Sequence, residues 1–311
     1  MPNRDDLTLY PTADGSITFW SKTFQEAFHS HFGAKQEAQA KFVIPTRIPE
    51  KANRLANAAT DLSSHTLTSL NILDVCYGLG YNSAAAIESV YSVLVLGKEA
   101  ADRESSPYLH IVALENNLQV PQQAIAQGLT KIWSPAIDEI LQEVATKQQI
   151  ATTGLQMQLR IGDARQTIAT VPERWADAIF LDPFSPPHCP QLWTVEFMQL
   201  LANCLKFDGY LVTYSCAAAV RSAMLAAGLT IGSTTPVGRK SPGTIACLSP
   251  DLISPLSETE REPLQTRAAI PYRDPTLRDE ATTILSRRQA EQSTCSLPSS
   301  SSWRKQRFNS A

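Results

Sequence analysis

Apolar positions along this chain change their spacing near residue 69. From Ser69 onward, short β-rich apolar runs alternate with segments of helical spacing. The strand candidates are LNILDVC, LHIVALE, LQMQLRIG, ADAIFLD, GYLVTYS, LTIGSTT and TIACLS. The first five are almost continuously apolar, as strands covered on both faces should be. This alternation predicts an α/β fold with a mostly parallel, doubly wound sheet.

The last two strand candidates are separated only by the loop PVGRKSPG. A loop this short permits an antiparallel hairpin but not a right-handed crossover. We therefore expect a seven-stranded sheet that is mostly parallel and ends in an antiparallel hairpin. This Rossmann-like layout resembles that of S-adenosylmethionine-dependent methyltransferases.

Different patterns flank this central region. Residues 1–66 contain a hairpin signal at Asp14-Gly15, and phenylalanines at 24, 28 and 32 have the spacing of a helix face. After residue 250 the periodicity fades and Pro, Ser and Thr become frequent. The predicted organisation is an N-terminal hairpin and helix module (1–66), the α/β domain (67–250) and a polar, partly disordered tail (251–311).

Composition narrows the class of protein. The chain has 311 residues, 43% of them hydrophobic, and a formal net charge of -3. These values exclude bulk disorder and a globally basic nucleic-acid coat, although a local basic patch stays open. The six cysteines form no C-x-x-C pair, which favours a reducing cytoplasm over a zinc or dithiol site. Without an apolar leader or an 18-residue apolar stretch, we expect a cytoplasmic protein with no membrane partner.

Acidic side chains end four consecutive strand candidates. They are Asp74, Glu115, Asp163 and Asp182. Open α/β sheets bind their ligands beyond the carboxyl ends of the strands. We therefore expect these carboxylates to converge on one crevice.

A Gly-x-Gly sequence, Gly78 and Gly80, follows the first of these strands and precedes a helix. Glycine there permits a tight turn and close approach of a ligand. A carboxylate after the second strand suits ribose hydroxyls, and one after the third suits the amine of adenine. The acids favour S-adenosylmethionine, a cation, over a nicotinamide dinucleotide, whose motif needs Gly or Ala where Ser83 stands. Alternatively, the glycines form an ordinary turn, and Glu115 and Asp163 only cap helices or turns.

A stiff loop carries the fourth carboxylate. It reads DPFSP from Asp182 to Pro186, and prolines restrict its backbone. A rigidly held carboxylate beside a sulfonium can bind a methyl-accepting amine, orient its lone pair and take its proton. We therefore expect Asp182 to be catalytic, and Phe184, Pro186 and Trp193 to contact the substrate. Alternatively, Asp182 caps the next helix and Trp193 anchors that helix in the core.

Four segments carry a more specific likeness. They are ADGSITFWSKTFQEAFHSHFGAKQEAQAKFV, YGLGYNS, FLDPFSPPHCPQLWT and PVGRKSPGTIA. In this order they resemble motifs of the tRNA 5-methylaminomethyl-2-thiouridine methyltransferases, over residues 7 to about 250. Pro183 stands where that family has glycine. The resemblance implies methyl transfer from S-adenosylmethionine to the 5-aminomethyl nitrogen of a wobble uridine, with tRNA as the partner.

The resemblance also implies roles for individual residues. Gly78, Gly80 and Asn82 contact the cofactor, Glu115 its ribose, Asp163 its adenine, and Asp182 the amine. Asp74, just ahead of the glycine loop, is assigned to the same cofactor site. In the N-terminal motif, His29, Ser30 and Glu37 are expected to line the substrate pocket.

A tRNA substrate requires basic residues for its phosphates. Arg239 and Lys240 are preferred, because the last hairpin lies near the pocket in such folds. Further candidates, each of which can instead be a solvated surface charge, are Arg47, Lys51, Arg287, Arg288, Arg304, Lys305 and Arg307. His29 and His31 lack partners at ligand spacing, so no metal is expected.

Two other functions remain open from the sequence. One is an amine methyltransferase or aminopropyltransferase-like enzyme that acts on a polyamine or another small molecule. The other is an inactive tRNA-binding module of the same fold. Bifunctional members of the resembled family add an oxidase domain, for which 311 residues leave no room. We therefore expect a stand-alone methyltransferase whose amine is supplied by a separate upstream enzyme.

Overall fold

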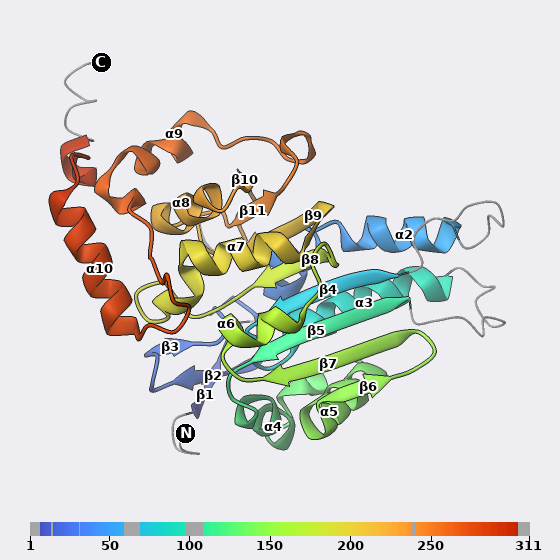
Figure 1. The fold of residues 1–311 in the computed structure, drawn as a ribbon. Coiled ribbons are helices and arrows are strands. Elements are labelled where there is room, and N and C mark those ends of the chain that lie inside the picture. The colour runs from blue at the N-terminus through green and yellow to red at the C-terminus, as the bar shows by residue number, and fades with distance from the viewer. Residues whose placement is uncertain are drawn as a thin grey trace.

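One large sheet organises the molecule (Figure 1). The structure is a computed structural model that describes residues 7–13, 15–30, 32–58, 69–96, 108–237 and 241–303. The strand order is β10-β11-β9-β8-β4-β5-β7-β6. The strands are β4 (Leu70–Val75), β5 (Leu109–Glu115), β6 (Gln149–Ala151), β7 (Leu155–Ile161), β8 (Ala176–Leu181), β9 (Leu205–Thr213), β10 (Thr230–Ser233) and β11 (Thr244–Cys247).

The pairing confirms the expected α/β class. Strands β9, β8, β4, β5 and β7 are parallel neighbours, and β11 pairs antiparallel with both β9 and β10. In the described part of the chain the sheet has eight strands instead of seven. The additional strand, β6, spans three residues and pairs antiparallel with the free edge of β7. Three residues are too few to carry a recognisable apolar period.

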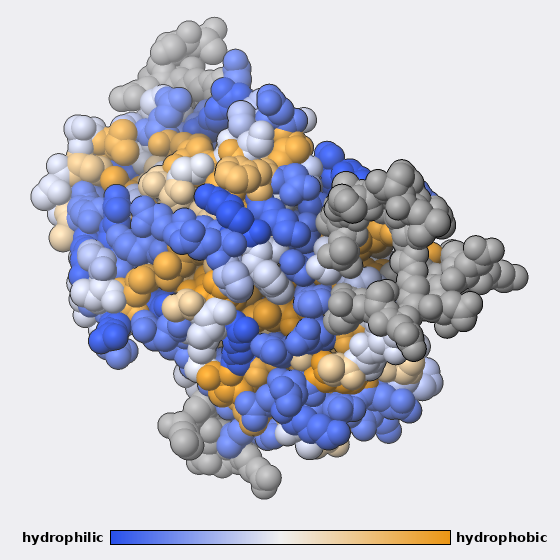
Figure 2. Space-filling model, turned by 45° about the vertical axis from the view of Figure 1, so that its right-hand side comes forward, coloured by the Kyte–Doolittle hydropathy of each residue, from blue (hydrophilic) through white to orange (hydrophobic). Residues whose placement is uncertain are grey.

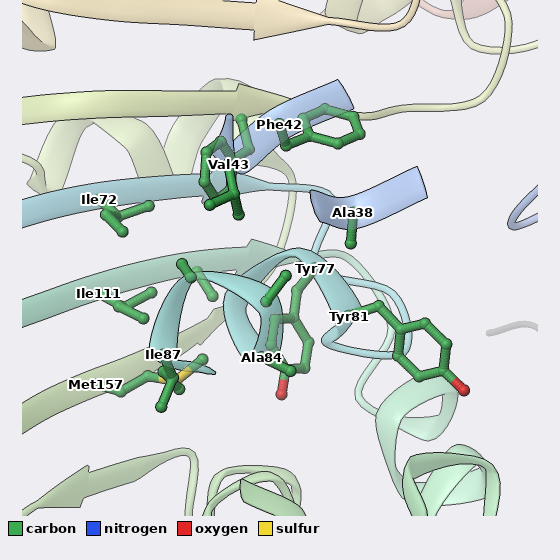
Figure 3. Packing of buried hydrophobic residues seen from close by; sticks show 14 of the residues in the cluster. Ala38, Phe42, Val43, Ile72, Tyr77, Tyr81, Ala84, Ile87, Ile111 and Met157 are labelled. Carbon is green, nitrogen blue, oxygen red and sulfur yellow. The ribbon is translucent and has the colours of Figure 1, made fainter. Parts of the chain in front are cut away.

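Helices cover both faces of this sheet. Even-numbered residues of β4, such as Ile72, belong to one core, and odd-numbered ones, such as Leu73, belong to the other. The first core packs against α1 (Ala34–Glu37), η2 (Ala38–Val43), α2 (Ile48–Ala58), α3 (Tyr81–Leu96), α4 (Gln119–Ala126), η4 (Leu129–Ile132) and α5 (Pro135–Lys147). Figure 3 shows part of it, with Ile72, Ile111 and Met157 of the sheet lying beside Ala84 and Ile87 of α3.

The second core lies under α6 (Ala164–Thr167), η5 (Ile168–Thr170), η6 (Pro190–Trp193), α7 (Val195–Cys204), α8 (Ala218–Ala226) and α10 (Ala281–Thr294). On the surface shown in Figure 2, hydrophilic residues dominate and hydrophobic ones form small separated patches, as is normal for a folded chain. No helix within the described residues has the length and apolar character needed to cross a bilayer.

The N-terminal module differs from its prediction. It forms a small antiparallel sheet of β1 (Leu7–Pro11), β2 (Ile17–Ser21) and β3 (Glu26–Ala27). The predicted helix over the phenylalanine repeat is wrong in its first half, because helix begins only at Ala34. Phe24 lies in a turn and Phe28 follows β3, so their four-residue spacing does not form a helix face. Asp14 and His31 lie outside the described residues.

The segment after residue 250 also differs from the expected loosely ordered tail. Within residues 241–303 it contains η7 (Pro250–Leu252), α9 (Glu258–Arg261), η8 (Glu262–Gln265), η9 (Arg267–Ala269) and α10. Ile284 of α10 is fully buried against the second core. Arg287 and Arg288, two candidate phosphate contacts, donate to the backbone carbonyls of Arg273 and Ile270. The boundaries of the three predicted regions stay a prediction.

Asp177 organises the edge of the sheet where its parallel strands begin. Its buried carboxylate accepts hydrogen bonds from the backbone of Asn71 (2.8 Å) and from Nζ of Lys206 (2.7 Å). Nζ of Lys51 lies 3.6 Å away, and the side chain of Lys51 is only 9% exposed. Lys51 is therefore a structural cation. The guanidinium of Arg47 lies over the ring of Tyr210, and neither residue lines the cavity at the opposite edge of the sheet.

The turn from β4 into α3 buries Asp74 completely. Ser83 Oγ donates to Asp74 Oδ2 at 2.6 Å, and Oδ1 is buried without a hydrogen-bond partner. Burial raises the pKa of Asp74 to about 7, with a further contribution from the nearby Asp182 carboxylate. Gly80 in the same turn has φ of +83°, and a Cβ there would meet Tyr77 Oη at 2.4 Å. The glycine requirement at this position is therefore structural.

We predict that Asp74 makes the free energy of unfolding of the ligand-free protein decrease as pH rises. Its folded-state pKa is raised above the unfolded value of 3.8, so its contribution is present below pH 4 and is lost as pH rises toward 7. Asp74→Asn removes this dependence. Its free energy of unfolding, relative to wild type, should improve by up to ~4 kcal/mol between pH 4 and pH 8, measured by urea denaturation. Parallel pH curves for wild type and Asp74→Asn would contradict this, and exposed Asp251→Asn is the control.

We also predict that Asp177→Asn destabilises the fold by about 3 kcal/mol, because it leaves the buried Lys51 ammonium with only the exposed Asp208 carboxylate, 3.8 Å away, as counter-charge. Urea unfolding at constant pH measures the change. The control is Glu143→Gln, which removes an exposed pair with Lys147 and should cost less than about 1 kcal/mol. Equal effects of the two substitutions would refute a structural role for the buried charge.

Candidate active site

A cavity of about 640 Å³ opens where the parallel strands end. Its wall combines the ends of β4, β5, β7 and β8 with the N-terminal module. Nine of the predicted site residues line it: His29, Ser30, Glu37, Gly78, Asn82, Glu115, Asp163, Asp182 and Phe184. Four predicted residues do not line it: Asp74, Gly80, Pro186 and Trp193. Arg239 and Lys240 lie outside the described residues.

Glu115 is held rigidly at the end of β5. Its Oε2 accepts from the backbone N–H of Gly78 and its Oε1 from that of Asn117, both at 2.9 Å. Burial raises the pKa of Glu115, and these backbone donors oppose the rise. Each carboxylate oxygen can accept more than one hydrogen bond. The arrangement fits two vicinal hydroxyls, because it is fixed in orientation and retains acceptor capacity.

Gly78 permits this contact with Glu115. Its φ is +56°, and a Cβ would lie 3.3 Å from the ring of Phe28. A side chain at this position would therefore be strained and crowded. The residue forms part of the cavity wall beside Glu115.

Asp163 is both a helix cap and a residue of the cavity wall. It is the N-cap of α6, where its side chain accepts from the backbone N–H of Arg165 at 2.9 Å. It also lines the cavity, and its side chain is 39% exposed. The Arg165 guanidinium pairs with the same carboxylate at 2.6 Å. Asp163 is thus a helix cap whose carboxylate still reaches the cavity.

Asp182 enters the cavity on the loop that follows β8. Asn82 Nδ2 donates to Asp182 Oδ2 at 3.0 Å, and the backbone N–H of Asp182 donates to the carbonyl of Val75. Tyr214 Oη donates to the carbonyl of Pro183 at 2.9 Å. Side-chain donors therefore fix both the carboxylate and the loop backbone, in addition to the restraint from proline.

Trp193 contributes to this restraint from the core. Its indole Nε1 donates to the carbonyl of Phe184 at 2.8 Å, and its side chain is fully buried against Tyr214. This differs from the expected contact with the substrate. Pro186 is likewise buried outside the cavity wall. Both residues therefore support the loop from the protein interior and do not line the cavity.

The N-terminal module supplies residues that the sequence interpretation missed. The Glu26 carboxylate accepts from the backbone N–H of Ser185 at 2.8 Å and from its hydroxyl, and His188 Nδ1 lies 3.2 Å away. Phe24 stacks on Phe184 with ring centroids 4.3 Å apart. Glu26 and Phe24 both lie in the N-terminal segment that resembles the family motif, and this was the sequence signal for their role. The helical spacing of the phenylalanines pointed instead to a helix face.

Polar residues of the same module meet the cavity from another side. His29 Nδ1 is 2.8 Å from Thr18 Oγ1, and its ring stacks on Tyr81. The backbone N–H of Ser30 donates to Glu37 Oε2 at 2.7 Å, while Ser30 Oγ is buried without a hydrogen-bond partner. Within the described residues no group of three His, Cys, Asp or Glu could hold a metal ion.

These carboxylates match the cofactor that the sequence predicts. S-Adenosylmethionine carries ribose hydroxyls and an adenine amine as donors, together with positively charged ammonium and sulfonium groups. The cavity offers Glu115, Asp163 and Asp182 as acceptors of one sign, within a volume of about 640 Å³. An anionic pyrophosphate would meet repulsion from the same groups.

Comparisons with known proteins agree with this geometry. A family model described as S-adenosyl-L-methionine-dependent methyltransferase matches residues 127–249. The crystal structure of MnmC2 from Aquifex aeolicus is 31% identical, with a TM-score of 0.75, and the match covers 94% of this chain and 87% of that one. An uncharacterized protein of Methanocaldococcus jannaschii is 27% identical over 283 residues, which are 88% of this chain and 69% of that protein.

The chain is also similar to part of a larger enzyme. The tRNA 5-methylaminomethyl-2-thiouridine biosynthesis bifunctional protein MnmC of Azoarcus sp. (strain BH72) is 25% identical over 243 residues. The match covers 74% of this chain and 35% of that protein, so the chain spans about a third of the bifunctional relative. Together with the fold and the cavity, these likenesses show that the chain is an S-adenosylmethionine-dependent methyltransferase of the MnmC methyltransferase-like family.

Proposed function

We propose that this enzyme methylates the 5-aminomethyl nitrogen of a uridine, or 2-thiouridine, at the wobble position of tRNA. The observation that carries the proposal is the place of Asp182. Asp182 lies in one cavity with Glu115 and Asp163, the carboxylates proposed to bind the cofactor, and with aromatic side chains of the N-terminal module. The relatives named MnmC, whose full name specifies a tRNA 5-methylaminomethyl-2-thiouridine, support the choice of acceptor.

Residues at the carboxyl ends of β4, β5 and β7 would bind the cofactor. Glu115 would bind the ribose hydroxyls and Asp163 the adenine amine, with Gly78 and Asn82 beside them. Asp74 and Gly80 do not line the cavity; they would support the cofactor site indirectly, by stabilising the turn between β4 and α3. The bound cofactor supplies an electrophilic methyl group on a sulfonium. The protein residues only orient it and exclude water.

Asp182 would act on the acceptor. An alkyl amine is mostly protonated at neutral pH, and only its neutral form has the lone pair that attacks a methyl carbon. The Asp182 carboxylate can accept a hydrogen bond from the amine, receive its proton and aim its lone pair. Asn82 fixes the orientation of this carboxylate. The bond from nitrogen to methyl forms as the bond from sulfur to methyl breaks, and one proton leaves the nitrogen.

An aromatic wall would hold the uracil ring. Phe184 follows Asp182 by two residues and contacts Phe24 (centroids 4.3 Å apart) and Phe28 (5.0 Å). All three side chains line the cavity. Stacking of a base on aromatic rings contributes about 1–3 kcal/mol per base and suits a base turned out of its own stack. His29, Ser30 and Glu37 would contact the polar edge of the nucleoside.

The tRNA backbone needs cations outside this cavity. Arg239 and Lys240 remain the proposed phosphate contacts, although they lie outside the described residues, as do Arg304, Lys305 and Arg307. The proposal includes a separate upstream enzyme that installs the amine. It also includes a cytoplasmic location, which six free thiols favour.

We predict that Asp182→Asn lowers methyl transfer to tRNA by at least about 100-fold while cofactor binding stays near that of wild type. The variant keeps the size of the side chain but cannot take a proton. Transfer of labelled methyl groups to tRNA from cells that lack this protein gives the rate. Nucleoside mass spectrometry identifies the product, and calorimetry measures cofactor affinity.

The matched control is Asp208→Asn, since the Asp208 side chain is 61% exposed beside Lys51 at the opposite edge of the sheet. It should retain wild-type transfer. Label that enters polyamines or other small amines, but not tRNA, would refute the proposed acceptor. Full activity of Asp182→Asn would refute the role of its carboxylate.

We predict that Glu26→Ala lowers kcat by about tenfold, with little change in cofactor affinity. Loss of its carboxylate frees Ser185 and so loosens the loop that carries Asp182, and misplaced reacting groups slow the chemical step. Glu26→Gln can still accept from the Ser185 N–H and should restore most of the rate. Single-turnover transfer with saturating cofactor measures the difference. Equal kcat for Glu26→Ala and wild type would contradict this prediction.

A further inference from the structure

The segment between η9 and α10, residues 270–280, packs beside the part of the cavity wall that contains Asp163 and Arg165. We call it the C-terminal strap. Its Tyr272 forms a parallel bridge with Thr194, and its Leu277 carbonyl accepts from Gln166 Nε2 at 2.9 Å. The backbone N–H of Asp274 donates to Glu196 Oε2 at 2.7 Å. The strap is therefore fixed to α6 and to the start of α7.

One side chain links the strap to the cavity. Arg165 Nη1 donates to Asp274 Oδ2 at 2.7 Å and to the carbonyl of Asp279 at 2.9 Å. Its Nε and Nη2 donate to the carboxylate of Asp163, at 3.1 Å and 2.6 Å. The Arg165 side chain is 10% exposed and that of Asp274 is fully buried. The guanidinium is thus held from both sides in a single orientation.

Asp274 is itself held rigidly by the strap. Its second oxygen, Oδ1, accepts from the backbone N–H groups of Arg278 and Asp279 and from the hydroxyl of Thr276, each at 3.2 Å. The two oxygens therefore have separate partners: Oδ1 organises the turn, and Oδ2 anchors Arg165. A rigid anchor lowers the cost of ordering the groups that depend on it.

We infer that the C-terminal strap positions the adenine-binding carboxylate, with Asp274 acting through Arg165 to set the orientation of Asp163. Asp274 and Arg165 are positioning residues, because Asp163 is the group that would touch the adenine amine. Asp163 already accepts a backbone hydrogen bond as the cap of α6, and this single bond leaves its carboxylate free to rotate. The pairing with Arg165 removes that freedom. The inference rests on the proposed role of Asp163 and is independent of the acceptor.

The test compares two ligands that differ only at the purine. S-Adenosyl-L-homocysteine presents an amine to Asp163, whereas S-inosyl-L-homocysteine presents a carbonyl oxygen, which a carboxylate repels. Calorimetry gives the ratio of their dissociation constants for each variant. Asp274→Asn retains an oxygen for the turn but turns an amide donor toward Arg165. We expect it to reduce the preference for adenine about tenfold, mainly by weakening the adenosyl ligand.

Three further variants make the outcome decisive. Asp163→Asn should lose the preference, and so should Arg165→Lys, because an ammonium cannot span both carboxylates as a guanidinium does. Arg165→Lys decides the question if Asp274→Asn does not fold. The control is Arg273→Gln, which removes a strap ion pair with Glu196 that does not touch Arg165, and it should keep the wild-type ratio.

Two results would overturn the inference. If Asp274→Asn and Arg165→Lys weaken the binding of both ligands equally, or change neither affinity, the strap only stabilises the fold. If wild type and Asp163→Asn show the same ratio, Asp163 does not recognise adenine and the strap has nothing to position. A loss of preference in Asp274→Asn supports the inference even if tRNA is not the acceptor, so the two proposals fail separately.

Discussion

Four carboxylates at one edge of a sheet repel one another, and the active site depends on how each is stabilised separately. Each receives a different donor: a serine hydroxyl, a pair of backbone N–H groups, a guanidinium and a side-chain amide. In the order Asp74, Glu115, Asp163 and Asp182, these donors come from Ser83, from Gly78 and Asn117, from Arg165 and from Asn82. The remaining negative potential favours a cationic ligand. The same edge that is costly for the free protein is therefore suited to a sulfonium.

Much of this arrangement could be predicted from local sequence. The five central strands are continuous apolar runs, and a parallel sheet brings their carboxyl ends to the same edge. The fold class, the site at that edge and the convergence of Glu115, Asp163 and Asp182 follow from these two facts. The role of a single carboxylate does not follow from local sequence, because the same residue can cap a helix or bind a ligand. Asp163 caps α6 and also lines the cavity, so the structure allows both roles.

The sequence failed where contacts between distant segments override local pattern. The phenylalanines at 24 and 28 have helical spacing, but both pack on Phe184, which is about half the chain away. Glu26 binds Ser185 over a separation of 159 residues. The strap has no apolar period, because its burial depends on Asp274 and Tyr272 instead of on a helix face. Patterns within a short window carry no information about such pairs.

The two ends of the chain thus hold different halves of the site. Glu26, near the beginning, fixes the loop that bears Asp182 and Phe184, where the acceptor would bind. Asp274, near the end, holds Arg165 and hence Asp163, where the cofactor adenine would bind. No described side chain contacts both Glu26 and Asp274 in the hydrogen bonds and ion pairs of the structure. Methyl transfer requires the cofactor and the acceptor to be held in alignment. Asn82, in the first turn of α3 beside the proposed cofactor residue Gly78, donates to Asp182 and would link the two halves directly.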